Sequence, residues 1–154
     1  MAEFGASASQ TINPGESVIF TVTVVPPNNN YIHHSDGTGN VLLSGAQCGR
    51  RKNSCCCKRK VANFFADFGA NIAVPTGQTV GEISVALAID GATLPNSIMR
   101  STPDAVEEFN NISRAINVPI WLGCCQTLTV RNTSSIPIIM EDANLVITGP
   151  DTIN

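Results

Sequence analysis

The chain has 154 residues and a mass of 16.2 kDa, the size of one domain or of one domain with an arm. Charged residues make up 14% of it and hydrophobic residues 43%, with a mean hydropathy of +0.11, so it can bury a core and is not expected to be disordered. Twelve glycines and nine prolines argue against a helical protein. No apolar run approaches a membrane span, and residues 1–10 show no secretory signal.

In chain order, residues 1–16 carry no core pattern and are predicted to form an N-terminal arm or tether. Residues 17–25 (SVIFTVTVV) are rich in β-branched residues and lie between proline-containing turns, which predicts a strand. A short strand is expected at residues 40–44 and a longer one at residues 61–74. Between them, residues 47–60 form a basic, cysteine-rich insert.

Residues 82–90 (EISVALAID) give the clearest strand pattern, because large apolar residues alternate with Ser84, Ala86 and Ala88. Small residues on that second face favour close packing there, against a second sheet or a partner subunit. The following Asp90-Gly91 predicts a hairpin turn. A short helix is expected over residues 101–109, and further strands over residues 112–121, 126–132 and 143–147. This pattern predicts an all-β sandwich or jelly roll over residues 17–148, with a C-terminal tail at residues 149–154.

Several motifs carry a resemblance to known proteins. From Gly69 the chain reads GANIAVPTGQTVGEISVALAIDGATLPNSIMRSTPDAVEEFNNI, and later GCCQTLTVRNTSSIPIIMEDANLVI, while His34-x-Asp36-Gly37 and Gln47-Cys48 lie upstream. Over roughly residues 12–147 this plan resembles a family of small proteins from Firmicutes and from their tailed phages and prophages. That family is similar to the C1q/TNF-like jelly roll, including the C-terminal domain of collagen-like spore-surface glycoproteins.

The resemblance implies an all-β jelly-roll sandwich of the C1q/TNF-like type that assembles as a homotrimer. This chain differs from the other members in its longer insert at residues 49–60, and it has no collagen-like Gly-X-Y stalk.

The six cysteines are candidates for disulfides or for cross-links between chains. Neighbouring cysteines seldom bond to each other, because the small ring strains the peptide, and in a strand Cys124 and Cys125 would point to opposite faces. Cys48 could pair with one of them across adjacent strands, or the triple cysteine could link chains at a threefold axis. Zinc is the competing interpretation, but the cysteine spacing fits no common ligand pair and only His33 and His34 could supply nitrogen, so no metal is expected. The candidates are Cys48, Cys55, Cys56, Cys57, Cys124 and Cys125.

Six of the nine basic residues lie within the insert, with no acid among them: Arg50, Arg51, Lys52, Lys58, Arg59 and Lys60. This charge could contact nucleic acid or an acidic protein surface, or form a solvated loop. The insert has no aromatic residue to stack on bases, so nucleic acid is not the expected partner. An acidic capsid lattice is the preferred functional interpretation.

No catalytic residue is predicted. The run from His33 to Asp36 contains the residue types of a catalytic triad, but neighbours in sequence do not have triad geometry, and a polar strand end is expected. The adjacent Glu107 and Glu108 would not face each other as an acid–base pair. Asn111 and Asn132 begin formal glycosylation sequons and are interpreted as turn residues. The aromatic residues expected in the core or at a subunit interface are Phe64, Phe65, Phe68 and Trp121.

These observations predict a non-enzymatic structural protein without cofactors. The first hypothesis is a phage virion accessory component, a capsid-decorating or head-fibre trimer displayed on the particle surface and attached to the capsid through the N-terminal arm. The alternatives are a spore or cell-surface protein that is cross-linked through cysteines, and a carbohydrate-binding module whose loops bind host-surface glycans. No membrane partner is expected.

Overall fold

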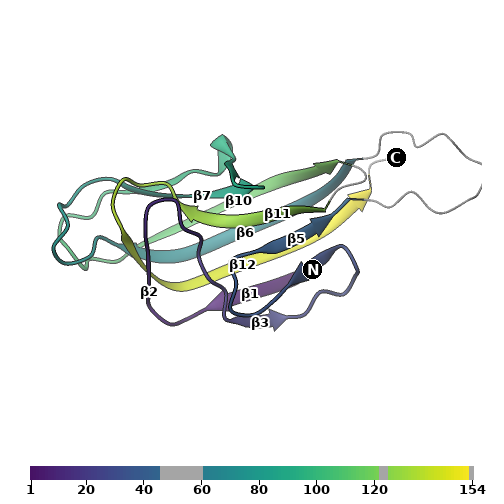
Figure 1. Ribbon diagram of the computed structural model, residues 1–154, viewed down its shortest axis with the longest axis horizontal. Coiled ribbons are helices and arrows are strands. Elements are labelled where there is room, and N and C mark those ends of the chain that lie inside the picture. Colours follow the sequence, from purple (N-terminus) through teal and green to yellow (C-terminus); the bar gives the residue numbers. More distant parts are fainter. Residues whose placement is uncertain (46–60, 122–124, 153–154) are drawn as a thin grey trace, which may run out of the picture.

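The computed structural model describes residues 1–45, 61–121 and 125–152, which form two antiparallel β-sheets (Figure 1). Sheet A has the strand order β10-β6-β12-β1-β3, with β2 also paired to β12. Its strands are β1 (Ala2–Ala6), β2 (Gln10–Ile12), β3 (Val22–Val25), β6 (Val61–Ala73), β10 (Asn110–Trp121) and β12 (Ile138–Thr152).

Sheet B has the order β4-β5-β11-β7-β8, with β9 also paired to β7. Its strands are β4 (Ile32–His34), β5 (Val41–Ser44), β7 (Ile83–Ile89), β8 (Ala92–Thr93), β9 (Met99–Ser101) and β11 (Cys125–Asn132). Within the described ranges the helical structure is limited to one 3-10 turn, Pro95–Ser97, and no helix there could cross a membrane. The predicted all-β sandwich is confirmed.

The hydrophobic core lies between the two sheets and is built from alternate residues of each strand. In β6, Phe64 and Phe68 are fully buried, whereas Phe65 and Asp67 between them are exposed. Phe64 and Phe68 therefore occupy the core, as predicted. Phe65 and Trp121 do not: they are 45% and 60% exposed on the outside of sheet A.

The predicted N-terminal arm is wrong, because residues 2–6 and 10–12 belong to sheet A. Strand β1 lies between β12 and β3, and its inward residues Ala2 and Phe4 are 0% exposed. Strand β2 pairs with the start of β12. The segment AEFGA does alternate with period two, but three of its five residues are alanine or glycine, so its apolar pattern is weak. Burial of Phe4 leaves this segment no freedom to act as a tether.

The predicted C-terminal tail is also wrong for most of its length. Strand β12 continues to Thr152, and Asp151 pairs with Asn63 of β6 after a shift of register. The pairing continues because β6 is long enough to offer partners beyond the expected strand end.

The expected strand over residues 17–25 forms only in its second half, as β3. Ser17 makes an isolated bridge to Arg131 of β11, and Phe20 makes one to Thr38, whereas Val22 pairs with Gly5 of β1. The segment therefore crosses from sheet B to sheet A. A change of partner sheet interrupts the ladder even though the side chains continue to alternate.

The expected helix over residues 101–109 is absent, and an irregular turn follows β9 instead. The Glu108 carboxylate accepts hydrogen bonds from the backbone N–H groups of Asp104 and Ala105, at 2.9 and 3.0 Å. Glu107 has a φ of +58°, and its N–H donates to the Val74 carbonyl. A left-handed residue cannot continue a right-handed helix, so the local signals for a helix start form a turn.

Ala86 and Ala88 on the second face of β7 are 0% exposed, which confirms the predicted close packing there. Their burial does not require a second sheet or a partner subunit on this face. Ala86 is the cross-strand neighbour of Arg131, and Ala88 is the neighbour of Thr129 and Thr93. Because an alanine side chain projects so little, longer side chains of the same sheet can cover it.

Candidate functional site

Several large apolar side chains are exposed on the outer face of sheet A. Of nine exposed large hydrophobic residues in the described chain, four lie on this face, namely Val22, Val24, Phe65 and Trp121. Exposed apolar residues are ordinary when scattered, but a group on one face of one sheet marks an interaction surface. The outer face of sheet A is therefore the candidate functional site.

One edge of this face is aromatic. In β10 the residues Ile116, Val118 and Ile120 point into the core, so the alternating residues around them point outward. Trp121 lies opposite Val61 of β6, and Phe65 lies opposite Asn117 of β10. These two strands form the side of sheet A that ends in the edge strand β10.

The opposite edge of the same face holds an apolar groove with a volume of about 290 Å³. Gly5 of β1 forms its floor, and Val22 and Val24 of β3 form one wall. A Cβ atom at Gly5 would lie 3.4 Å from Cγ2 of Val24, so any side chain there would narrow the groove. The other wall, from Asp142 to Asn144, is the place where the β12 register shifts. Sheet A therefore carries an exposed aromatic edge and an apolar groove at the opposite edge.

The described residues that flank the insert lie at the end of the sandwich that carries Trp121 (Figure 1). Ser44, near the start of the insert, pairs with Cys125, while Val61, directly after it, pairs with Trp121. The candidate contact residues Arg50, Arg51, Lys52, Lys58, Arg59 and Lys60 themselves lie outside the described residues.

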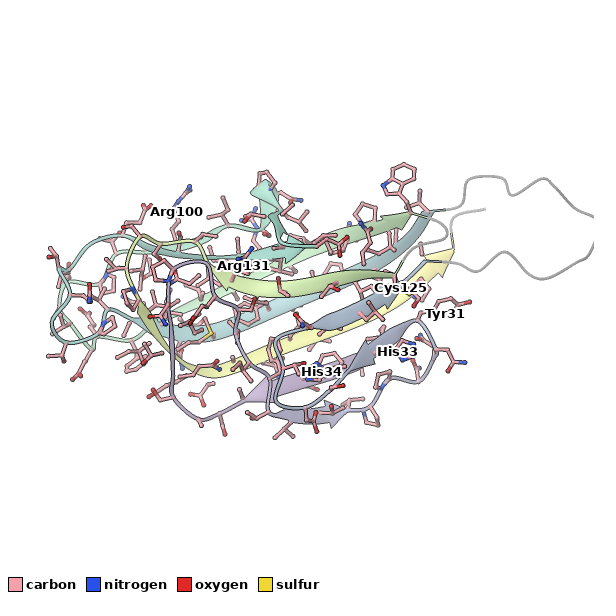
Figure 2. The ribbon with its side chains drawn as sticks, viewed as in Figure 1. Tyr31, His33, His34, Arg100, Cys125 and Arg131 are labelled. Carbon is pink, nitrogen blue, oxygen red and sulfur yellow. The ribbon has the colours of Figure 1, made fainter. Side chains whose placement is uncertain are left out.

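Only one of the six cysteines can be placed. Cys125 is exposed at the start of β11, and its Sγ lies 3.3 Å from Oγ of Ser44 (Figure 2). Cys48, Cys55, Cys56, Cys57 and Cys124 lie outside the described residues, so the cross-links stay predictions. Among the described residues, no group of three or more histidine, cysteine, aspartate or glutamate side chains could hold a metal ion.

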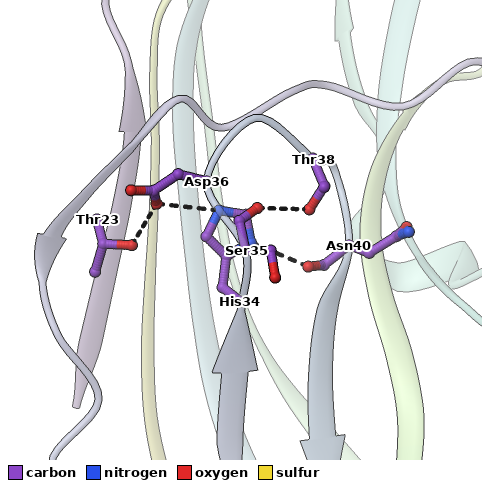
Figure 3. Close-up of polar contacts among 6 residues, drawn as sticks. All are labelled: Thr23, His34, Ser35, Asp36, Thr38 and Asn40. Atoms are coloured by element: carbon purple, nitrogen blue, oxygen red, sulfur yellow. Dashed lines mark hydrogen bonds and ion pairs between the residues drawn. The ribbon is translucent and has the colours of Figure 1, made fainter.

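The predicted polar strand end at His33 and His34 is confirmed, since both residues close β4. Figure 3 shows His34 at the end of this strand. The His34 Nδ1 lies 3.0 Å from the Asn40 carbonyl, and its Nε2 lies 3.9 Å from Oδ1 of Asp36. The Asp36 carboxylate also accepts a 2.6 Å hydrogen bond from Thr23. The His34 side chain is 1% exposed and is therefore packed inside the fold.

Glu107 and Glu108 have separate partners, as expected. Glu107 accepts a 2.7 Å hydrogen bond from Thr76, whereas Glu108 binds the backbone of the turn before it.

The two sequon asparagines differ. Asn132 is the last residue of β11 and is 1% exposed. Its Oδ1 accepts from the Ser134 N–H at 2.8 Å, so it holds the turn that follows the strand, in keeping with the turn interpretation. Asn111 lies inside β10, so the turn interpretation is wrong for this residue. Its side chain bonds across to Asn71 of the neighbouring strand β6, which a sequon pattern does not reveal.

Neither a search against protein-family models nor one against curated proteins finds a match. Among solved structures, the chain is similar to Eiger TNF from S. frugiperda, with a TM-score of 0.64 and 10% identity over 99% of this chain and 93% of that one. It also matches the C-terminal domain of EclA, a sugar-binding protein, with a TM-score of 0.37 and 14% identity over 93% and 80% of the two chains. A third match is CBM35 from Cellvibrio japonicus Abf62, with a TM-score of 0.36 and 9% identity over 94% and 99%.

The first of these matches confirms the predicted TNF-like jelly roll. At 10% identity it establishes the fold alone. Sequence reasoning missed Val22 and Val24 as surface residues, because their segment reads as a core strand until its change of sheet is known.

Proposed function

We propose that this chain is a non-enzymatic structural protein that assembles as a homotrimer through the outer face of sheet A and is displayed on the surface of a tailed-phage particle. The observation that carries the proposal is the pairing of an aromatic edge, Trp121 and Phe65, with an apolar groove over Gly5 on the same face. The location on a particle is supported by the resemblance of residues 12–147 to a family of small proteins from Firmicutes and from their tailed phages and prophages.

The two edges suit a head-to-tail contact, in which the aromatic edge of one copy meets the groove of the next. Such a heterologous interface closes into a ring when the rotation between copies allows it. In a threefold ring each aromatic edge contacts the groove of the next copy, so no edge is left exposed. Fully burying a large apolar side chain contributes roughly 1.5–3 kcal/mol. Trp121 and Phe65 are 60% and 45% exposed, so each would contribute a part of this to the assembly.

The mass of the purified protein tests the assembly. Light scattering coupled to size exclusion should give three times the monomer mass of 16.2 kDa, both with and without reductant. Val24→Asp should yield monomers, because it places a charge in the groove wall. The matched control is Val80→Asp, which changes another exposed valine in the segment between β6 and β7 and should leave the trimer intact. A wild-type monomer, or equal effects of the two variants, would refute assembly through this face.

The particle location needs a separate test. Antibody labelling of phage particles from an induced lysate should decorate the virion surface, and purified spores should remain unlabelled. The reverse pattern would refute the phage role and leave the assembly itself untouched.

The exposed Cys125 supports one alternative, a spore or cell-surface protein joined by disulfides. That protein would form polymers that collapse to the trimer or monomer on reduction. Unchanged mass with and without reductant would exclude it.

A further inference from the structure

Arg131 is held in an unusual way on the outer face of sheet B, which is the sheet that the proposed assembly leaves free (Figure 2). Its Nε and Nη2 both donate to the Gly15 carbonyl, and Nη1 donates to the Gly91 carbonyl at 2.8 Å. Gly15 precedes β3, and Gly91 forms the turn between β7 and β8. Two loops distant in sequence therefore fix one half-buried guanidinium.

No carboxylate in the described ranges lies within 4.0 Å of this guanidinium, since the two ion pairs found there involve His34 and Arg100. The neighbouring acids are turned to other partners. Asp90 accepts from the Gln126 side chain and from the Thr127 N–H, and Glu16 accepts from Asn13. A guanidinium has five N–H donors, and three contacts to carbonyls leave donors and a full positive charge for a ligand.

Beside Arg131 lies a polar pocket of about 370 Å³, lined by Gly15, Thr93, Arg131, Asn132, Thr133 and Ser134. Two of its hydroxyl groups are held by Ser84: Thr133 Oγ1 lies 2.8 Å from Oγ of Ser84, and Ser134 Oγ accepts from the Ser84 N–H at 2.7 Å and donates to the Ser84 carbonyl at 3.2 Å. Ligand pockets of about 300–1,000 Å³ hold small molecules, so this one suits a single sugar ring.

We propose that this pocket binds an acidic sugar of the uronic acid class, with Arg131 pairing the carboxylate. The Thr93 hydroxyl can donate to a sugar hydroxyl or accept from one, and the hydroxyl oxygens of Thr133 and Ser134, which are bonded to Ser84, can still accept. Neutral sugars lack the charge for Arg131, and a bare carboxylate lacks the hydroxyls. The inference goes beyond the proposed structural role and is independent of it, because the pocket lies on sheet B.

Calorimetric titration of the intact protein with D-glucuronate, D-glucose and acetate, at 0.15 M NaCl, tests the proposal. Glucuronate should bind saturably with one site per chain, and glucose and acetate should each bind at least tenfold more weakly. No binding of glucuronate would overturn the proposal. Equal binding of glucose would refute the role of charge, and equal binding of acetate would reduce the pocket to a simple anion site.

Three variants locate the site. Arg131→Gln should abolish glucuronate binding, but it also removes the ties to Gly15 and Gly91, so a second variant is needed. Thr93→Val changes an exposed side chain with no hydrogen bond in the described chain, and should weaken binding at least threefold at unchanged Tm. Arg100→Gln removes another exposed arginine and should have no effect. If Thr93→Val binds as wild type, or if Arg100→Gln loses as much affinity as Thr93→Val, the assignment to this pocket is wrong.

Discussion

The Nε2 atom of His34 lies 3.9 Å from the Oδ1 atom of Asp36, and this contact joins the end of β4 to the turn that follows it. The same Oδ1 atom accepts a hydrogen bond from Thr23 of β3, at the edge of sheet A. The imidazole ring is packed against Phe4, at a centroid distance of 4.6 Å, and Phe20, at 6.1 Å. Its Nδ1 faces a carbonyl oxygen, so Nδ1 carries a proton and donates to Asn40. Nε2 is buried without a hydrogen-bond partner. Packing against the two phenylalanines, rather than the contact to Asp36, therefore defines the role of His34.

His34→Ala should accordingly lower the free energy of unfolding by about 2–4 kcal/mol, because it leaves a cavity beside Phe4 and Phe20. Asp36→Asn should cost below ~1 kcal/mol, since the Asp36 side chain is 56% exposed and solvent screens its charge. Urea denaturation of both variants measures the difference. Equal losses would show that the contact between His34 and Asp36, and not the packing, holds this turn.

Gly39 has no space for a side chain. A Cβ atom there would clash with the Val18 carbonyl oxygen and would lie 3.0 Å from Cβ of Ser17. Neither atom can move away without a shift of the backbone. Gly39→Ala should therefore destabilise the fold by more than ~2 kcal/mol or prevent it from forming.

Two other glycines serve as controls for that substitution. Gly81→Ala meets nothing within 4 Å and has no positive φ, so its stability should stay near wild type. Gly37→Ala has open space but a φ of +81°, so it should cost about 1–2 kcal/mol from backbone strain. In thermal unfolding Gly81→Ala should be the most stable of the three variants, Gly37→Ala the next and Gly39→Ala the least stable. A stable Gly39→Ala would contradict the close approach of Gly39 to Val18.

Asn132 ties three chain segments together from a buried position. Its Nδ2 bonds the carbonyls of Ile12 and Ile136, each at 2.9 Å, and its Oδ1 accepts from the Ser134 N–H at 2.8 Å. Asn132→Ala leaves these backbone groups without a partner and should cost about 2–4 kcal/mol. At roughly 2–4 °C per kcal/mol for a chain of this size, calorimetry should show a clear fall in Tm. Asn111→Ala on exposed β10 should shift Tm far less.

Filling the groove should weaken assembly without harming the fold. At Gly5 an added Cβ meets Val24 at 3.4 Å and the Ala143 carbonyl at 3.7 Å, which are tolerable contacts. Gly5→Ala should keep the monomer stable and raise the concentration at which the trimer dissociates. Sedimentation-equilibrium centrifugation measures this concentration. Gly81→Ala is the matched control, and an unchanged dissociation for Gly5→Ala would argue against the groove as the contact.

Local patterns were sufficient to predict much of the fold. The alternation of residues 82–90 located β7, the strand-like composition of residues 61–74 located β6, and the Asp90-Gly91 pair located the turn to β8. These local sequence patterns failed where the neighbouring strands, and not the segment itself, determined the structure. Strand β1 is too rich in small residues to stand out, but it is buried because β12 and β3 lie on either side of it.

The candidate sites were harder to predict than the strands. Sequence alone identified Phe65 and Trp121 as core or interface residues and could not decide between the core and an interface. Arg131 was one arginine among three outside the insert, and nothing nearby in sequence marks it. Its partners Gly15 and Gly91 are brought to it by the crossing of residues 15–18 to β11 and by the β7–β8 turn.

The sequence by itself determined the class of the fold, because period-two alternation and turn residues act over a few positions and need no distant partner. Only the tertiary structure decided which apolar residues remain outside and which polar ones converge. Those outcomes depend on strand order and register, and a shift of register by one residue moves every side chain to the opposite face. The outer face of sheet A and the pocket beside Arg131 are both products of that pairing.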